Sequence, residues 1–268
     1  MPEWLQPERA AHGEWIERLQ IDLPPVLRGT DGPDRITGTG KAEVIYGYRG
    51  ADTLIGGGGE GRDTIFGGAG ADSIVANGGR ALVYAGTGND FVSSYGGLNL
   101  VHLGDGDDRA DLGGSAAAYG GAGNDLISVF GGTLLAYGGS GRDTINGSSG
   151  DDTIFGGSGN DLLRSGSGED VVSGGDGDDR IVDGAGDDLI ETGTGRDRID
   201  FRFGGGEDIV ADFDRGDDRI VLASGTDLDA LLDDVSYSIR GLRIETDDID
   251  VLLLGFYGRL DEDDFILV

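Results

Sequence analysis

Cysteine is absent from this sequence, which excludes disulfide bonds and metal sites built from thiolates. Histidine occurs only twice, at His12 near the start and at His102 within the repeats, and the two do not form a plausible set of zinc ligands. Proline occurs five times and glycine does not recur at every third position, so the chain is not collagen-like. No apolar run approaches the roughly 20 residues that a membrane-spanning helix requires, so no membrane span is expected.

Positive charge is also scarce, since 20 lysines and arginines stand against 51 aspartates and glutamates, a net charge of −31. Such a chain repels the phosphates of nucleic acids and the headgroups of anionic lipids, so neither is expected as a partner. The length of 268 residues allows one large domain or two small ones. Glycine makes up 55 of these residues, and a glycine-rich acidic composition is typical of disorder. Only the order of the residues argues against disorder.

A nine-residue pattern repeats along most of the chain. Seven copies follow one another without interruption from Gly138 to Asp200, and the first of them reads GGSGRDTIN. Each copy has glycine at position four, aspartate at position six and an aliphatic residue at position eight, and every copy except the one with Ser148 has glycine at position two. Less regular copies begin near Gly29 and continue through Gly47 and Gly67. The repeats therefore define a region over residues 29–200.

The spacing of the repeat has a physical meaning. Glycine adopts positive φ without steric penalty, so the first six residues can turn sharply. The last three residues form a short strand whose middle side chain points inward. If two copies make one coil, loops on the same side recur every 18 residues and stack about 4.8 Å apart. Each aspartate then lies close to the next, and such a column of carboxylates requires a cation with oxygen ligands, such as calcium.

The pattern resembles the RTX nonapeptide G-G-x-G-x-D-x-U-x, a calcium-binding β-helix repeat. The resemblance implies an all-β fold, a right-handed parallel β-roll, which is a solenoid with calcium bound in its loops. It implies about ten Ca²⁺ ions, held by the position-six aspartates and by loop carbonyl groups. The alternative interpretation, a disordered acidic linker, is expected to describe the chain without calcium.

The expected calcium ligands form two columns, one on each side of the roll. The first column consists of Asp34, Asp52, Asp72, Asp90, Asp108, Asp125, Asp143, Asp161, Asp179 and Asp197. The second column consists of Asp63, Asp152, Asp170 and Asp188. Between Asp63 and Asp152, position six is occupied by Ala81, Asn99, Ala116 and Leu134. We expect this stretch to bind no calcium and to be closed by Gly-Gly turns over apolar side chains.

Strand alternation places an aromatic ladder on the outer face of one sheet. Its rungs are the ninth positions Tyr46, Phe66, Tyr84, His102, Tyr119, Tyr137 and Phe155. The equivalent column of the opposite sheet becomes polar. A continuous apolar face marks an interaction site or a covered surface. The sequence leaves three possibilities open: a polysaccharide or protein partner binds the ladder, two rolls pair through it, or an N-terminal helix covers it.

The two ends of the chain differ from the repeats. Residues 1–28 are predicted to contain an amphipathic helix, which either caps the first coil or lies on the ladder. Residues 201–268 are predicted to form a C-terminal β cap. Its segment GEDIVADFDRGDDRIVL and its terminal DDFILV resemble the flank of RTX proteins exported by type I secretion. That resemblance implies the secretion machinery as a partner and an extracellular location. A simple edge strand is the alternative for DDFILV, and no signal-peptide pattern is present at the start.

No enzyme is expected. About 28 residues precede the first repeat, and neither a nucleophile elbow nor a phosphate-binding lysine motif occurs. The sequence therefore predicts a secreted calcium-binding β-roll that folds on binding calcium outside the cell and acts as a binding or structural module. One alternative is an ice-binding or adhesin-type RTX module. Another is a calcium-dependent folding and export module that works with a separate enzyme.

Overall fold

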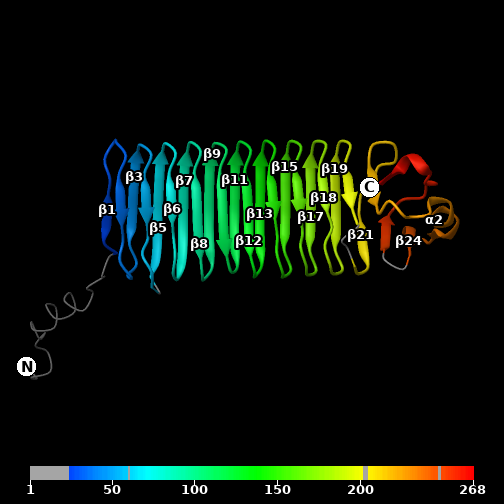
Figure 1. Ribbon diagram of the computed structural model, residues 1–268, viewed down its shortest axis with the longest axis horizontal. Helices are drawn as coiled ribbons and strands as arrows, with labels where there is room; N and C mark the ends of the chain where they lie inside the picture. Colours follow the sequence, from blue (N-terminus) through cyan, green and yellow to red (C-terminus); the bar gives the residue numbers. More distant parts are fainter. Residues whose placement is uncertain (1–23, 60, 202–204, 247–248) are drawn as a thin grey trace, which may run out of the picture.

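The structure, a computed structural model, describes residues 24–59, 61–201, 205–246 and 249–268. These residues form an elongated stack of coils with β1 at one end and the C-terminal elements at the other (Figure 1). Each regular coil contributes one strand to each of two sheets. The helix predicted within residues 1–28 falls mainly on residues 1–23, which lie outside the described residues.

The first sheet has 14 strands. In spatial order they are β1 (Val26–Arg28), β3 (Val44–Arg49), β5 (Arg62–Ala69), β7 (Arg80–Thr87), β9 (Asn99–Asp105), β11 (Ala116–Ala122), β13 (Leu134–Ser140), β15 (Thr153–Ser158), β17 (Val171–Asp176), β19 (Leu189–Thr194), β21 (Asp208–Val210), β25 (Asp250–Leu254), β24 (Gly241–Glu245) and β23 (Ser236–Tyr237). All neighbours from β1 to β25 are parallel, and only β23, β24 and β25 pair in antiparallel fashion.

The second sheet has 12 strands, and all of its pairings are parallel. In spatial order they are β2 (Arg35–Thr37), β4 (Thr53–Ile55), β6 (Ser73–Val75), β8 (Phe91–Tyr95), β10 (Arg109–Gly113), β12 (Leu126–Phe130), β14 (Thr144–Asn146), β16 (Leu162–Arg164), β18 (Arg180–Val182), β20 (Arg198–Asp200), β22 (Arg219–Leu222) and β26 (Phe265–Leu267). Two parallel sheets joined coil by coil confirm the all-β parallel roll expected from the repeat.

The core is a narrow stack of aliphatic side chains between the sheets. In the short strands β4, β6, β14, β16 and β18 the middle residue is buried and its neighbours are at least partly exposed, as in β14, where Ile145 is fully buried. Position eight supplies this inward side chain because side chains alternate along a strand. In the middle of the roll, β8, β10 and β12 extend to five residues and add a second inward layer that includes Leu112 and Val129.

The parallel stack continues beyond residue 200. Strand β21 pairs with β19 and β25, and β22 pairs with β20 and β26. The boundary drawn at residue 200 therefore marks the end of the regular nonapeptides, whereas the coils continue through strands that keep the pattern aspartate, any residue, aliphatic. Helix α2 (Leu228–Asp234), which the sequence analysis did not predict, lies between β22 and β23, and a short 3₁₀ helix η2 (Glu262–Asp264) precedes β26. The terminal Phe265–Leu267 is an edge strand of the second sheet.

Candidate functional site

The aspartates of the first predicted column lie directly above one another. In every residue after Asp34 one carboxylate oxygen accepts a hydrogen bond from the backbone N–H of the column residue one coil earlier, as Asp143 Oδ1 does from Asp125 N at 2.8 Å. The same bond, at 2.6 to 2.9 Å, links every neighbouring pair from Asp34 to Asp197. The structure thus brings all ten residues together in one column, at the start of the second-sheet strands.

The second column is interrupted. Asp152, Asp170 and Asp188 form a continuous row with the same hydrogen bond at 2.7 to 2.8 Å. Asp63 lies nearer the first coils, where its Oδ1 accepts from Glu43 N at 3.1 Å. Between Asp63 and Asp152 the structure places no carboxylate at position six.

Three column residues were missed by the sequence analysis. Glu43 occupies position six ahead of Asp63, Asp208 continues the second column after Asp188, and Asp218 continues the first after Asp197. Asp208 and Asp218 precede the short strand sequences IV and RIV, and a glycine stands two residues before each of them, Gly206 and Gly216, as at position four of the repeat. Glu43 could have been found from its place before the strand VIY, with glutamate in place of aspartate.

The second oxygen of most column aspartates receives no hydrogen bond although it is buried. This holds for Oδ2 of Asp52, Asp72, Asp90, Asp108, Asp125, Asp143, Asp161, Asp170, Asp179, Asp188 and Asp197. Among the ion pairs of the described residues, none includes an aspartate of either column. Because a buried carboxylate oxygen without a hydrogen-bond donor or counter-charge is costly, these oxygens fit a bound cation.

Glycine at position one leaves the space that such a cation needs. A Cβ atom at Gly138 would lie 2.4 Å from Asp143 Oδ2 and 2.5 Å from the carbonyl oxygen of Gly156 in the next coil. Gly156 itself stands in the same relation to Asp161 and to Gly174. A carboxylate oxygen and a carbonyl oxygen of successive coils therefore face one small volume. Hard oxygen ligands from carboxylates and backbone carbonyls are those that Ca²⁺ prefers, so the residues present fit calcium.

The electrostatics of the columns agree with this assignment. Burial raises the pKa of Asp90 and Asp125 to about 7, and neighbouring aspartates add to the effect, although a backbone hydrogen bond opposes it. Burial likewise raises the pKa of Asp143 and Asp179 to about 6. Without a cation the columns therefore resist full ionisation near neutral pH.

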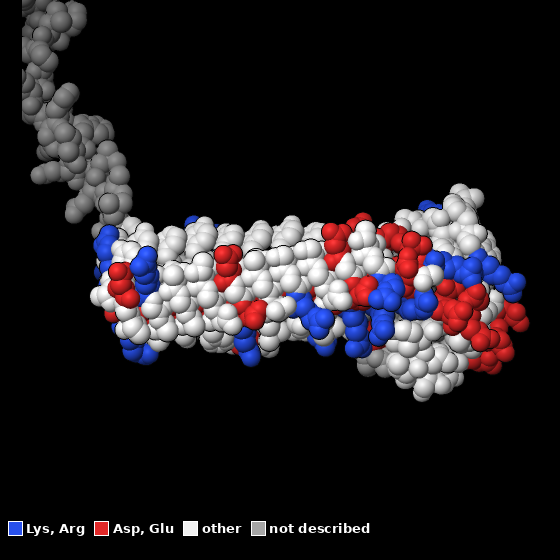
Figure 2. Space-filling model, turned by 90° about the horizontal axis from the view of Figure 1, so that it is seen from above, with Lys and Arg blue, Asp and Glu red and all other residues white. Residues whose placement is uncertain are grey.

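Viewed from above, uncharged residues cover most of the roll, and charged side chains gather towards its C-terminal end (Figure 2).

The middle of the second column is apolar and closed, as expected. Ala81, Asn99, Ala116 and Leu134 occupy position six there and are all buried. Asn99 Nδ2 donates to the Gly96 carbonyl oxygen at 3.0 Å, within the turn. Gly96 and its neighbour Gly97 have positive φ, which a side chain at either position would oppose. That this stretch binds no calcium stays a prediction.

The seven predicted rungs form one unbroken aromatic ladder on the outer face of the first sheet. From Tyr46 to Phe155, neighbouring ring centroids are 4.7 to 5.1 Å apart and the ring planes differ by 5 to 11°. Tyr84 and Tyr137 are each 38% exposed, so the rings present their edges to solvent. Burial lowers the pKa of His102, which keeps this rung neutral at pH 7. The ladder is thus an uncharged, half-buried strip along the roll.

The outer face of the second sheet becomes polar at the equivalent positions from Ser93 to Arg164, after Ile55 and Val75 in the first coils. Asn146 Nδ2 donates to Ser128 Oγ at 3.0 Å, and Arg164 donates to Asn146 Oδ1 at 2.9 Å. The two faces of the roll therefore differ as the sequence predicted. Whether residues 1–23 cover the ladder lies outside the described residues.

The comparisons with known proteins agree with this geometry. The sequence matches the family described as RTX calcium-binding nonapeptide repeat over residues 28–60, 58–83, 76–110, 137–172 and 173–210, more than half of the chain in total. The unmatched residues 111–136 overlap the middle stretch in which the second column lacks aspartate. No curated protein matches the chain. In the part of the chain that is described, no helix has the length and apolarity needed to cross a membrane. The chain belongs to the family of RTX calcium-binding nonapeptide repeat proteins.

Proposed function

We propose that this protein is a secreted, non-catalytic β-roll that folds when its loops bind calcium and then acts as a binding module. The observation that carries the proposal is the set of buried column oxygens without hydrogen-bond donors. Stacking these carboxylates without a cation opposes folding, whereas a shared cation favours it. Calcium binding and folding are therefore one coupled process.

Coupling to calcium suits a protein that is exported before it folds. Calcium sites of extracellular modules have dissociation constants of about 0.1–1 mM, so comparable sites would stay empty at the low calcium concentration of a cytosol. An unfolded chain can then thread a secretion channel and fold at the higher calcium concentration outside. The resemblance of residues 201–268 to the flank of type I secreted proteins supports this route. The same segment also pairs into both sheets, so it has a structural role besides.

The binding surface of this module is proposed to be the aromatic ladder, and its ligand a polysaccharide. Sugar rings have apolar faces that pack on aromatic side chains, and an extended glycan along the roll meets one ring after another. The aliphatic side chains of Leu82, Leu100 and Leu135 flank the rings on the same face and widen the apolar strip. Ice binding finds no support, because Thr87 is followed in register by Asp105, Ala122 and Ser140 rather than by a row of threonines.

Small-angle X-ray scattering tests the folding proposal. In chelator the full chain should expand to a radius of gyration of about 57 Å, the value for an unfolded chain of this length. Calcium at millimolar concentration should restore a compact rod, and magnesium should not, since Mg²⁺ demands shorter bonds and a stricter geometry. A compact particle in chelator would contradict the proposal.

Retention on immobilised polysaccharides, neutral and acidic, tests the binding proposal at saturating calcium. The wild type should be retained, and Tyr119→Ser, which removes a central rung, should weaken binding by about twofold to tenfold. Ser128→Ala on the opposite sheet is the matched control and should bind as the wild type does. Failure of the wild type to bind either class of glycan would refute the proposal that the ladder binds a polysaccharide. Concentration-dependent dimers that Tyr119→Ser abolishes would identify self-pairing instead.

A further inference from the structure

One coil of the second column departs from the others at position one. Most repeats have glycine there, because a side chain would meet the position-six carboxylate: a Cβ at Gly147 would lie 2.5 Å from Asp152 Oδ2. Asp183 occupies this position two coils later and is only 2% exposed. It directly follows β18, so its carboxylate enters the volume that elsewhere faces position-six oxygens.

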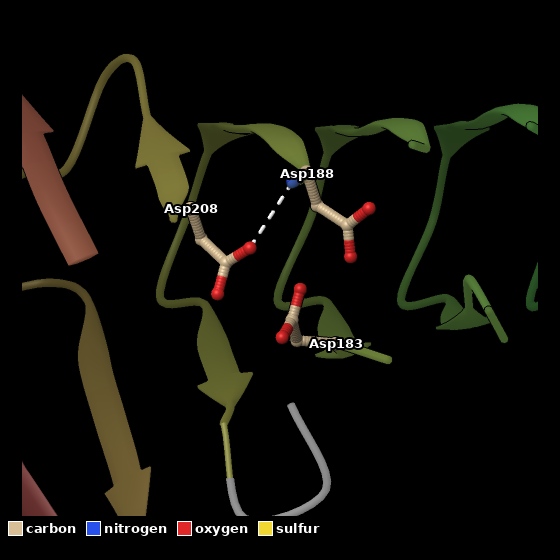
Figure 3. A group of neighbouring side chains, drawn as sticks. All are labelled: Asp183, Asp188 and Asp208. Carbon is tan, nitrogen blue, oxygen red and sulfur yellow. Dashed lines mark hydrogen bonds between the residues drawn. The ribbon is translucent and has the colours of Figure 1, made fainter. Parts of the chain in front are cut away.

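Asp183 completes a group of three buried carboxylates with Asp188 and Asp208. Oxygen atoms of the three residues all lie within 4.8 Å of one another. Asp188 belongs to the same loop as Asp183, and Asp208 begins β21 in the next coil (Figure 3). Asp188 N donates to Asp208 Oδ1 at 3.1 Å, which is the ordinary contact of the column.

The free oxygens of this group point to a ligand. Neither oxygen of Asp183 receives a hydrogen bond, and neither does Asp188 Oδ2, although all three atoms are buried. All three oxygens lie within 4.8 Å of one another, a span that two Ca–O bonds of about 2.3–2.6 Å cover, so a single Ca²⁺ can contact all three residues.

We propose that Asp183, Asp188 and Asp208 hold one calcium ion more tightly than the two-carboxylate loops do, so that this site fills first. The proposal rests on the calcium-coupled folding proposed above and adds that one site has a higher calcium affinity than the others. Its physical reason is ligand charge, because an additional carboxylate raises the attraction for a divalent cation, and the bound cation compensates a buried charge that otherwise has no partner.

Ser165 provides a natural comparison one coil earlier. It occupies position one next to Asp170, is 1% exposed, and its hydroxyl group receives no hydrogen bond. Its loop therefore has a buried side chain at the same place in the repeat as that of Asp183 but lacks the third charge. Replacing Asp183 by glycine and Ser165 by glycine changes the same position in adjacent coils, and only the first change removes a carboxylate.

Calcium binding to the full chain, measured by competition with a chromophoric chelator, tests the proposal. The wild type should show one ion bound about tenfold more tightly than the rest, and Asp183→Gly should lose that ion's advantage. Ser165→Gly should keep it. The proposal is overturned if Asp183→Gly keeps the tight ion, or if the wild type shows no tight class.

A gain-of-function variant guards against misfolding as an explanation. Ser165→Asp places a third carboxylate beside Asp170 and Asp188 and should yield a second tightly bound ion. Circular dichroism at saturating calcium shows whether each variant folds. If wild type and variants fold with calcium but the affinities are equal, the tight site is wrong and calcium-coupled folding stands. If calcium leaves the wild-type spectrum unchanged, the proposed function fails as well.

Discussion

At the scale of the residue, the two oxygens of each column aspartate have different tasks. In Asp125, Oδ1 accepts a hydrogen bond from Asp108 N at 2.9 Å and so holds two coils in register. Oδ2 is buried and free, and it is the oxygen available to a cation. This division explains why one residue type recurs at position six. A shorter or uncharged side chain would supply only part of the pair.

The raised pKa values predict that protonation of the column aspartates at low pH stabilises the fold and so partly substitutes for calcium. The ordinary aspartate pKa of 3.8 is raised by burial to about 7 in Asp125 and about 6 in Asp170. A carboxyl group with a raised folded-state pKa favours folding when protonated, and this contribution is lost as the pH rises through the folded-state pKa. Chelator-stripped protein should therefore gain β structure as the pH falls from about 7 towards 4.

Far-UV circular dichroism in chelator, recorded from pH 8 to pH 4, measures this effect. The control is the calcium-loaded protein, whose spectrum should change little above pH 6. A calcium-free protein that shows no gain of β structure down to pH 4 would argue that the columns do not oppose folding.

At the scale of the element, the glycines of the loops differ in how closely they approach the next coil. Gly138 lies against both Asp143 and the backbone of Gly156, so even one methyl group displaces a calcium ligand. Gly58, in contrast, has nothing within 4 Å of a Cβ atom. Glycine content alone does not distinguish these two kinds of position, whereas stacking of the coils does.

We therefore expect Gly138→Ala to destabilise the calcium-bound roll and Gly58→Ala to have little effect. Overpacking of a rigid site costs about 1–3 kcal/mol, and displacement of a calcium ligand adds to this. Thermal unfolding at fixed calcium concentration measures the difference between the two variants. Equal melting temperatures for Gly138→Ala and the wild type would contradict the loop geometry.

The sequence predicted the elements where the repeat is regular and failed where it decays. The inward position of Ile145 and the two columns followed from the nine-residue period, because glycine, aspartate and strand each occupy fixed places. No repeat predicts helix α2, although Asp227 caps its start by accepting a hydrogen bond from Ala230 N. Asp208 and Asp218 were missed because insertions of two and three residues move them off the 18-residue spacing of their columns. The third carboxylate of the Asp183 group became visible only when successive coils were placed together.

At the scale of the whole molecule, a net charge of −31 must be reconciled with a thin core. The column carboxylates are buried within the loops, and the hydrophobic stack is roughly one or two side chains wide in each sheet. Self-repulsion opposes compaction in such a chain, and bound divalent cations reverse it. On one side of the middle coils this self-repulsion is weaker, because Ala116 and Leu134 replace acidic residues there.

A far-UV circular dichroism titration of chelator-stripped protein with calcium tests the central claim most directly. The account predicts a change from a coil spectrum to a β spectrum at about 0.1–1 mM calcium, with no such change in magnesium. A β spectrum already present in chelator at neutral pH, and unchanged by calcium, would contradict it.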